Sequence, residues 1–200
     1  MNARHHAVIV SAVRTPMGSF NGSYSSAPAT KLGSLAIAEA AKRIQLPGDR
    51  IDEVLMGCVL SAGLGQAPAR QAAIGAGLPH SVGAVTVNKV CGSSLQAVMM
   101  ATKAIALGEA NVMVAGGMEN MTRAPFLLEK ARQGYRLGHG ELTDSLIKDG
   151  LWDVYNQFHM GNAGELCAAK YRLSRQEVDD FALESYSRAR DAIARGAFKK

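Results

Sequence analysis

The chain has 200 residues, of which 48% are hydrophobic and 20% charged, and its formal net charge is +5. This composition supplies enough apolar material for a folded core and excludes an intrinsically disordered chain. The basic residues are scattered and form no stripe with aromatic residues, so we expect no nucleic-acid binding. No uninterrupted apolar run approaches the length of a bilayer-spanning segment, so we also expect no membrane association.

The cysteines and histidines indicate neither a metal site nor a disulfide framework. The three cysteines, Cys58, Cys91 and Cys167, lie far apart and form no Cys-x-x-Cys pair. The histidines do not cluster apart from the terminal pair His5-His6, which we interpret as incidental. We therefore expect no metal and no cofactor. Free thiols and the absence of a long apolar leader predict a cytoplasmic protein.

The first 120 residues or so alternate strand and helix signals. The expected strands are 7–13, the run through Val85 and Val87, and the segments 54–60 and 111–115. The expected helices are 31–45, 66–76 and the apolar-periodic stretch from Leu95 to Ile105. Strands that alternate with helices of this length predict an α/β fold with a mixed, mainly parallel sheet covered by helices on both faces.

The alternation of strand and helix signals ends after about residue 120. The segment 121–159 is rich in glycine and holds no clear strand, and a helix is expected from Met160 to Tyr171. The last helix opens with Ser174 and Glu177 in the spacing of a capping box. We therefore predict domains at 1–121 and 122–200. The pattern also leads us to expect a return strand for the sheet, which these residues do not contain.

The apolar positions of the last helix fall on one face. The apolar positions recur at helical spacing and include Val178, Phe181, Ala182, Tyr186, Ala189 and Ile193.

Cys91 lies where a predicted strand gives way to a predicted helix. The first N–H groups of a helix have no internal partner, and the positive end of the helix dipole favours thiolate over thiol. A free cysteine is more often a small buried hydrophobe. The strand before it and the Gly-Ser-Ser after it favour the nucleophile here. Cys58 and Cys167, inside a predicted strand and a predicted helix, are interpreted as core packing.

Six segments resemble the thiolase family, most closely its biosynthetic short-chain branch. They run in order along almost the whole chain: AVRTPMGSF (12–20), GQAPARQAAIGAGLP (65–79), VNKVCGSSLQAV (87–98), VAGGMENMTRAPF (114–126), DGLWDVYNQFHMG (149–161) and LSRQEVDDFALESYSRA (173–189). Their order and spacing make the resemblance specific. It implies a thiolase fold of two similar α/β/α halves, of which this chain supplies the N-terminal half and part of an inserted CoA-binding loop domain.

The resemblance implies a role for Cys91 and its neighbour Ser93. Cys91 matches the family's acyl-accepting nucleophile, and Ser93 is the third residue of the same Cys-x-Ser motif. Cys91 would attack the thioester of acetyl-CoA to give an acetyl-enzyme. Its backbone N–H would form half of an oxyanion hole for the thioester carbonyl.

Five further residues match family positions near the site. Leu151, His159 and Met160 match residues that line the pantetheine channel and acyl pocket. A hydrogen-bonded structural imidazole is an equal alternative for His159, and Met160 is expected to be pocket wall. Gly116 and Gly117 are expected to permit close backbone approach beneath the site.

The resemblance also implies what these 200 residues lack. The family's C-terminal half supplies an Asn-Glu-Ala-Phe-like segment, the histidine of a Gly-His-Pro motif that activates the nucleophile, and a second cysteine in a Cys-x-Gly motif that acts as base. None of them occurs in residues 1–200. We therefore expect that the C-terminal half is needed and that the chain by itself exposes an apolar face. Ser94, where many members carry glycine, and Gly164-Glu165-Leu166, where Ala-Glu-Asn is common, depart from the family.

Three functional hypotheses stay open. The first is an acyltransferase of fatty acid metabolism that, as a full-length protein, condenses two acetyl-CoA to acetoacetyl-CoA and CoA, and runs the reverse thiolysis. The second is a longer-chain 3-ketoacyl-CoA thiolase with the same nucleophile. The third is a truncated, non-catalytic CoA-binding or assembly half. The resemblance implies a homo-oligomer, dimer or tetramer, with segment 124–142 in tetramer assembly.

Overall fold

The computed structural model describes residues 6–198. The chain divides into two compact units, Met1–Gly150 and Leu151–Lys200. His5 of the terminal histidine pair lies outside the described residues. The division into compact units follows Gly150. The predicted domain boundary after residue 121 rests on sequence texture and stays a prediction.

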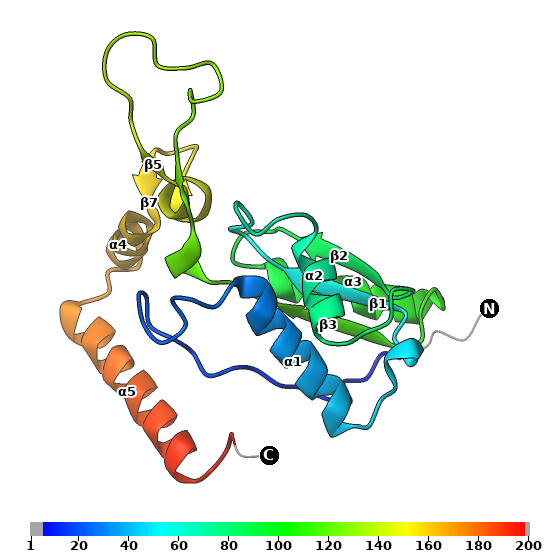
Figure 1. Cartoon of the computed structure of the whole chain (residues 1–200). Helices are drawn as coiled ribbons and strands as arrows, with labels where there is room; N and C mark the ends of the chain where they lie inside the picture. The colour runs from blue at the N-terminus through cyan, green and yellow to red at the C-terminus, as the bar shows by residue number, and fades with distance from the viewer. Residues whose placement is uncertain (1–5, 199–200) are drawn as a thin grey trace. The chain divides into compact units, whose positions relative to one another are not determined.

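The first unit is built on a three-stranded parallel sheet (Figure 1). Its strands are β1 (Glu53–Gly57), β2 (Gly83–Val87) and β3 (Met113–Gly117). Their order is β2-β1-β3, and both neighbours run parallel to β1 in the centre. The predicted α/β class with a mainly parallel sheet is therefore confirmed.

Three helices cover the two faces of this sheet. They are α1 (Ala29–Arg43), α2 (Pro68–Gly75) and α3 (Ser93–Leu107). The helices α1 and α2 pack against each other, and α2 contacts β1 and β2, whereas α3 contacts β1 and β3. All three helices were predicted from sequence to within about three residues of their bounds.

Alternation along β1 divides the core into two layers. Val54 and Met56 are buried in the cluster that contains Ile37 of α1. Leu55 points to the other face and packs with Ala97 and Ala101 of α3. Because successive side chains of a strand point to opposite faces, this burial on both sides defines an α/β/α sandwich.

Asp52 fixes the register at the start of β1 and β3. Its carboxylate accepts hydrogen bonds from the N–H groups of Val112 (2.9 Å) and Asn111 (2.7 Å). These two bonds lower the pKa of Asp52 below its ordinary value, because they stabilise the charged carboxylate.

The predicted strand at 7–13 is wrong for the described structure. Residues 7–13 form no strand, and Val8, Ile9 and Val10 are exposed at 75%, 81% and 65%. The sequence has the apolar, β-branched residues that strands favour. A strand also needs a hydrogen-bonded neighbour, and among residues 6–198 this segment pairs with none.

The helix α3 qualifies our expectation about membrane-spanning segments. The stretch Val90–Leu107 has a mean hydropathy of 1.3 over 18 residues, which is long and apolar enough by composition to cross a bilayer. Its contacts with β1 and β3 are those of a core helix in an α/β sandwich.

Short elements complete the two units. The segment predicted to hold no clear strand contains two short antiparallel ladders, β4 with β5 and β6 with β7. The short elements are η1 (Gly48–Arg50), η2 (Met121–Arg123), β4 (Phe126–Leu127), β5 (Thr143–Asp144), the π-helical turn η3 (Leu146–Leu151), β6 (Trp152–Asp153) and β7 (Phe158–His159). Two-residue ladders leave almost no periodicity in a sequence, which explains why they were missed.

The second unit carries the helices α4 (Met160–Tyr171) and α5 (Arg175–Ala194). The predicted capping box is confirmed, because the Ser174 hydroxyl accepts from the Glu177 N–H (3.2 Å) and the Glu177 carboxylate accepts from the Ser174 N–H (2.7 Å). The prediction that Cys167 packs in a core is wrong for the described structure, because Cys167 is exposed on α4.

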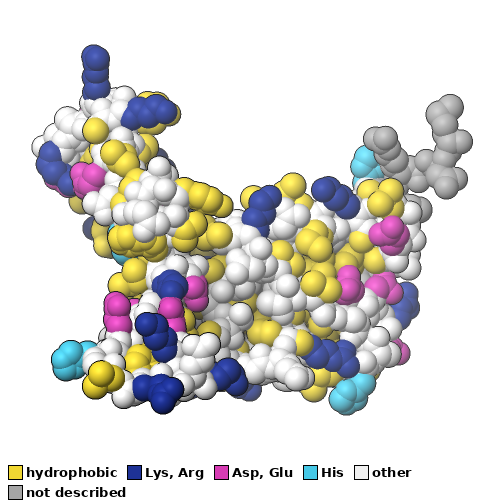
Figure 2. Space-filling view, turned by 90° about the horizontal axis from the view of Figure 1, so that it is seen from above, with side chains coloured by type: hydrophobic (Ala, Val, Ile, Leu, Met, Phe, Trp, Pro, Cys, Tyr) yellow, Lys and Arg dark blue, Asp and Glu magenta, His cyan; other side chains and the backbone are white. Residues whose placement is uncertain are grey.

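Large apolar side chains stay exposed in both units, as the yellow atoms of Figure 2 show. They include Ile9, Leu95, Leu107, Phe181, Tyr186 and Ile193, each more than 60% exposed. The apolar positions predicted for α5 are thus exposed among the described residues.

Candidate active site

Cys91 is an exposed free thiol at the junction of β2 and α3. It lies one residue before Gly92, the N-cap of α3, and two residues before the first helical residue, Ser93. The thiol therefore lies next to the end of the helix where backbone N–H groups lack internal partners and the dipole is positive. This placement offers backbone N–H groups to an oxyanion that forms beside the thiol.

Two side chains brace the loop that presents Cys91. The Asn88 carboxamide oxygen accepts a hydrogen bond from the Val90 N–H (3.0 Å). The Ser93 hydroxyl accepts from the Lys89 N–H (2.9 Å) and donates to the Val90 carbonyl (2.5 Å). Ser93 is only 5% exposed, so these bonds are shielded from water. Ser93 thus ties the residues before Cys91 to the first turn of α3.

Val90 has a strained backbone directly before Cys91. Its φ is 45°, in the left-handed region that β-branched residues avoid. Such a conformation costs about 1–3 kcal/mol and persists only where the surroundings fix it. The bonds from Asn88 and Ser93 fix it here. Strain of this kind clusters at functional sites, which favours a chemical role for the neighbouring thiol.

The start of α3 sits directly on two strand-end glycines. A Cβ on Gly57 of β1 would lie 2.7 Å from the backbone nitrogen of Ser94, and one on Gly117 of β3 would lie 2.9 Å from the Ser94 Cβ. Gly57 and Gly117 are paired across the sheet. The helix start therefore approaches the sheet as closely as it does only because both positions lack a side chain.

Gly116 and Gly117 differ in what they touch. A Cβ on Gly116 would meet only the flexible end of Met56, with the sulfur at 3.4 Å. Gly117 alone of this pair faces Ser94, so the expected close approach applies to Gly117. The Cβ of Ser94 lies where a side chain on residue 117 would otherwise be, and glycine at 117 leaves that space empty.

Cys58 lies in an environment opposite to that of Cys91. It follows β1 directly, is 2% exposed and belongs to the core cluster, so its predicted core packing is confirmed. Burial, and then the charge and hydrogen bonding of Glu119, raise the pKa of the Cys58 thiol to about 12. The Glu119 carboxylate also accepts from the N–H groups of Val59 (2.7 Å) and Leu60 (3.3 Å). Cys58 is thus held as a neutral thiol at physiological pH.

The second unit brings its three predicted site residues together. Trp152 of β6 pairs with His159 of β7 in an antiparallel ladder, so Leu151 and Met160, one step further out, flank the same end of that ladder. The His159 Nδ1 accepts a hydrogen bond from the Gly161 N–H (3.0 Å) and caps α4. Because Nδ1 accepts, the neutral ring carries its proton on Nε2 and has one donor left for another partner.

The structure thus forms two groups from the predicted residues. Cys91, Ser93 and Gly117 gather around the start of α3 in the unit Met1–Gly150. The acyl-pocket candidates described above gather on the β6–β7 hairpin in the unit Leu151–Lys200. Among residues 6–198, no three His, Cys, Asp or Glu side chains lie together as a metal-binding group.

Sequence reasoning missed three residues that build the site. Gly57 seats α3, Asn88 braces the Val90 turn, and Glu119 ties the loop after β1 to the end of β3. A glycine in the middle of the predicted strand 54–60 and an asparagine two residues before a turn were available as signals. The contact partners of Glu119 are about 60 residues away, and nothing in the local sequence indicates them.

The fold and the site define an α/β/α protein that presents an exposed cysteine at a strand-to-helix junction. The family model "Thiolase, N-terminal domain" matches residues 7–200. The chain is 56% identical over 190 residues to "Acetyl-CoA acetyltransferase 2" of Arabidopsis thaliana, covering 95% of this chain and 47% of that protein. It is 50% identical over 192 residues to "Probable acetyl-CoA acetyltransferase" of Escherichia coli K12, covering 96% and 49%.

A mitochondrial acetyl-CoA acetyltransferase of Mus musculus is 50% identical over 194 residues, covering 97% of this chain and 45% of that protein. The chain belongs to the thiolase family, and it corresponds to the N-terminal domain of that family. It spans about half the length of the curated relatives that it matches. The resemblance found in the six sequence segments is therefore confirmed.

The seating of α3 predicts an asymmetric response to two glycine substitutions. Gly57→Ala should lower the free energy of unfolding by about 1–3 kcal/mol, because the new methyl group collides with the backbone of α3. Gly116→Ala, the matched control, should leave it unchanged or raise it by up to about 1 kcal/mol, because alanine loses less backbone entropy. Urea unfolding of both variants measures the change in the free energy of unfolding. Equal changes in the two variants would contradict the close contact between α3 and Gly57.

The three thiols predict an order of alkylation. With iodoacetamide at pH 7, Cys91 and Cys167 should both react readily, because both thiols are exposed. Cys58 should stay unmodified until the pH approaches its pKa of about 12, since the thiolate is the reactive form. Mass spectrometry of the labelled peptides gives the three rates. Modification of Cys58 as fast as that of Cys91 and Cys167 would contradict its burial beside Glu119.

Proposed function

We propose that this chain is the N-terminal half of an acetyl-CoA acetyltransferase. The full-length enzyme would condense two acetyl-CoA to acetoacetyl-CoA and CoA, and would run the reverse thiolysis. The observation that carries the proposal is the presentation of Cys91, exposed beside the N-terminus of α3 on a braced and strained loop. The relatives named acetyl-CoA acetyltransferase at 50–56% identity support it.

Cys91 would carry the first half of the reaction by covalent catalysis. Its thiolate adds to the thioester carbonyl of acetyl-CoA, and the oxyanion that forms is stabilised by N–H groups at the helix start, the Cys91 N–H among them. The carbon–sulfur bond to CoA then breaks, and CoA leaves as the thiol after taking a proton. The acetyl group is now a thioester of Cys91.

The second half of the reaction forms the carbon–carbon bond. A base removes an α-proton from a second acetyl-CoA, and the carbanion attacks the acetyl carbonyl on Cys91. The Cys91 thiolate leaves, and acetoacetyl-CoA is released. The resemblance assigns the base to a cysteine, and the activation of Cys91 to a histidine, in the C-terminal half. Cys58 is unsuited to the role of base, because its raised pKa and its burial keep the proton on sulfur.

The β6–β7 hairpin would bind the pantetheine and acyl part of the substrate. Leu151 and Met160 offer apolar surface on either side of the ladder end. Because Nδ1 of His159 already accepts a hydrogen bond, its Nε2–H would donate to a carbonyl oxygen of the substrate. We propose that these residues form one wall of a narrow acyl pocket in the full-length enzyme, which would favour acetyl over longer acyl groups. A longer-chain 3-ketoacyl-CoA thiolase shares the Cys91 chemistry and differs in the width of this pocket.

The wider setting of the enzyme is part of the same proposal. We place it in fatty acid metabolism, in the cytoplasm, as a homo-oligomer with the segment 124–142 in tetramer assembly. We also propose that it needs no cofactor and binds neither nucleic acid nor membrane. The curated relatives include bacterial and mitochondrial proteins, so residence in the cytoplasm rests on the sequence of this chain.

The test of the proposed nucleophile is Cys91→Ala in the full-length protein. Acetoacetyl-CoA thiolysis should fall by at least about 10³-fold, because no other group can form the acyl-enzyme. Cys167→Ala, at an exposed cysteine, should keep normal turnover. Undiminished activity of Cys91→Ala would overturn the role of Cys91. An unmodified full-length protein without thiolysis activity would instead favour the non-catalytic alternative.

The two roles of His159 are separated by a conservative substitution. His159→Asn keeps an acceptor that caps α4, because asparagine is a favoured N-cap, but it removes the Nε2 donor. We expect KM for acetyl-CoA to rise about 2- to 10-fold, the loss of one hydrogen bond, with an unchanged melting temperature. Unchanged KM and kcat in His159→Asn would leave His159 with the capping role alone.

A further inference from the structure

One lysine lies in the same turn as the candidate nucleophile. Lys89 precedes Cys91 by two residues, and the Gly92 N–H donates to the Lys89 carbonyl (3.0 Å), which closes the turn. The Lys89 N–H donates to the Ser93 hydroxyl (2.9 Å). The backbone of Lys89 is therefore held at the start of α3, while Lys89 and Cys91 are both exposed.

The Lys89 side chain extends toward the helix that follows Cys91. Its Nζ donates to the Gln96 Oε1 (3.0 Å), and Gln96 is the fourth residue of α3. The Cα atoms of Lys89 and Cys91 are at most about 7 Å apart, because two residues of extended chain span no more. The flexible four-carbon stem of a lysine covers a distance of this order. The amine therefore reaches an acyl group on Cys91 by rotation about its side-chain bonds.

No carboxylate pairs with this amine. Lys89 is the only charged residue between Ser81 and Thr102, and among residues 6–198 it forms no ion pair. Lys148 is the contrasting case, because its hydrogen bond with Glu129 and the charge of that carboxylate raise the pKa of Lys148. An amine attacks a carbonyl in its unprotonated form, so a carboxylate partner slows the attack. Lys89 is bound instead to a neutral carboxamide.

We propose that Lys89 is a self-acetylation site that takes its acetyl group from Cys91. The inference rests on the proposed function, because acetyl-Cys91 is the donor. The unprotonated Lys89 Nζ adds to the thioester carbonyl, the carbon–sulfur bond to Cys91 breaks, and the leaving thiolate takes the proton that the nitrogen releases. An amide forms on Lys89, and Cys91 returns to a free thiol. The net reaction converts acetyl-CoA and lysine to CoA and N-acetyl-lysine, and it needs no further reactant.

The transfer to Lys89 competes with the formation of the carbon–carbon bond. Both reactions consume acetyl-Cys91, but an amide is far less reactive than a thioester, so the acetyl group on Lys89 remains on the chain. Acetylation also removes the positive charge of Lys89, the only charge between Ser81 and Thr102. Acetylated Lys89 therefore accumulates when the acetyl-enzyme is long-lived.

The first experiment follows the acetyl group in the full-length protein. The protein is treated with acetyl-CoA, free acetyl-CoA is removed by gel filtration, and peptide mass spectrometry locates the acetyl group over time. Hydroxylamine removes it from sulfur and leaves it on nitrogen. We expect it to move from Cys91 to Lys89 at a rate independent of protein concentration. Because of proximity, Lys89 should be modified at least about 10-fold faster than Lys103, an exposed lysine of α3.

The outcomes separate this inference from the proposed function. Stable acetyl-Cys91 with unmodified Lys89 would overturn the inference and leave the acyl-enzyme established. A rate that rises with protein concentration would show transfer between molecules, and it would overturn the inference in the same way. Failure to form any acetyl-Cys91 would overturn the proposed function and the inference together.

Three variants test the route of the acetyl group. Cys91→Ala should reduce acetylation of Lys89 to the rate of Lys103, because no thioester forms beside it. Cys167→Ala, at the other exposed cysteine, should keep the fast acetylation. Lys89→Arg keeps a positive charge but offers no amine, so acetyl-Cys91 should persist at least about 10-fold longer. Equal melting temperatures of the variants exclude misfolding as the cause. Fast acetylation of Lys89 in Cys91→Ala would overturn the role of Cys91 as donor.

Discussion

The close seating of α3 on the ends of β1 and β3 is the contact on which the rest of the site depends. Gly57 and Gly117 have no Cβ at the points where one would collide with Ser94. The helix start therefore lies directly on the sheet, and its position is set by backbone contacts rather than by flexible side chains. Cys91 lies two residues before the helix, so its backbone is held in place by the helix start. A nucleophile needs such placement, because small displacements of reacting groups reduce rates strongly.

The loop before α3 converts this seating into a defined orientation of the thiol. Ser93 and Asn88 hold the strained turn at Val90 through bonds to its backbone. The free energy of this strain is offset by the packed helix and by shielded hydrogen bonds. Cys58 shows what the same side chain becomes elsewhere in the molecule, since burial beside Glu119 keeps it protonated. Environment, and not residue type, separates the candidate nucleophile from the core thiol.

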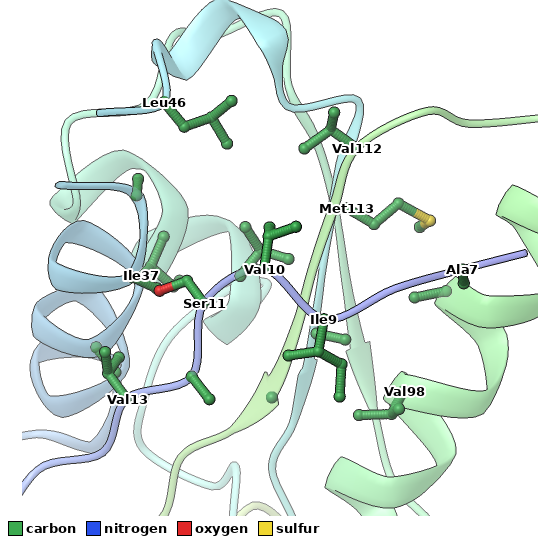
Figure 3. Close-up of a pocket in the computed structure, with 18 of the residues that line it drawn as sticks. Ala7, Ile9, Val10, Ser11, Val13, Ile37, Leu46, Val98, Val112 and Met113 are labelled. Atoms are coloured by element: carbon green, nitrogen blue, oxygen red, sulfur yellow. The ribbon is translucent and has the colours of Figure 1, made fainter. Parts of the chain in front are cut away.

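The open edge of β3 connects the fold to the length of the family's proteins. The three-stranded sheet is covered by helices on both faces, and an apolar cavity borders the edge strand β3 (Figure 3). The unpaired segment 7–13 and the exposed apolar face of α5 have the same cause in our interpretation, because the chain spans about half of its relatives' length.

The sequence by itself determined the helices, the parallel sheet, the capping box at Ser174 and the family, because periodicity, caps and ordered motifs are local signals. It also singled out Cys91 from its place between a strand and a helix. Tertiary structure decided what depends on distant partners: the seat at Gly57, the hydrogen bonds of Glu119, and the failure of 7–13 to form a strand. A strand exists only when another backbone pairs with it, and no local pattern shows whether that backbone is present.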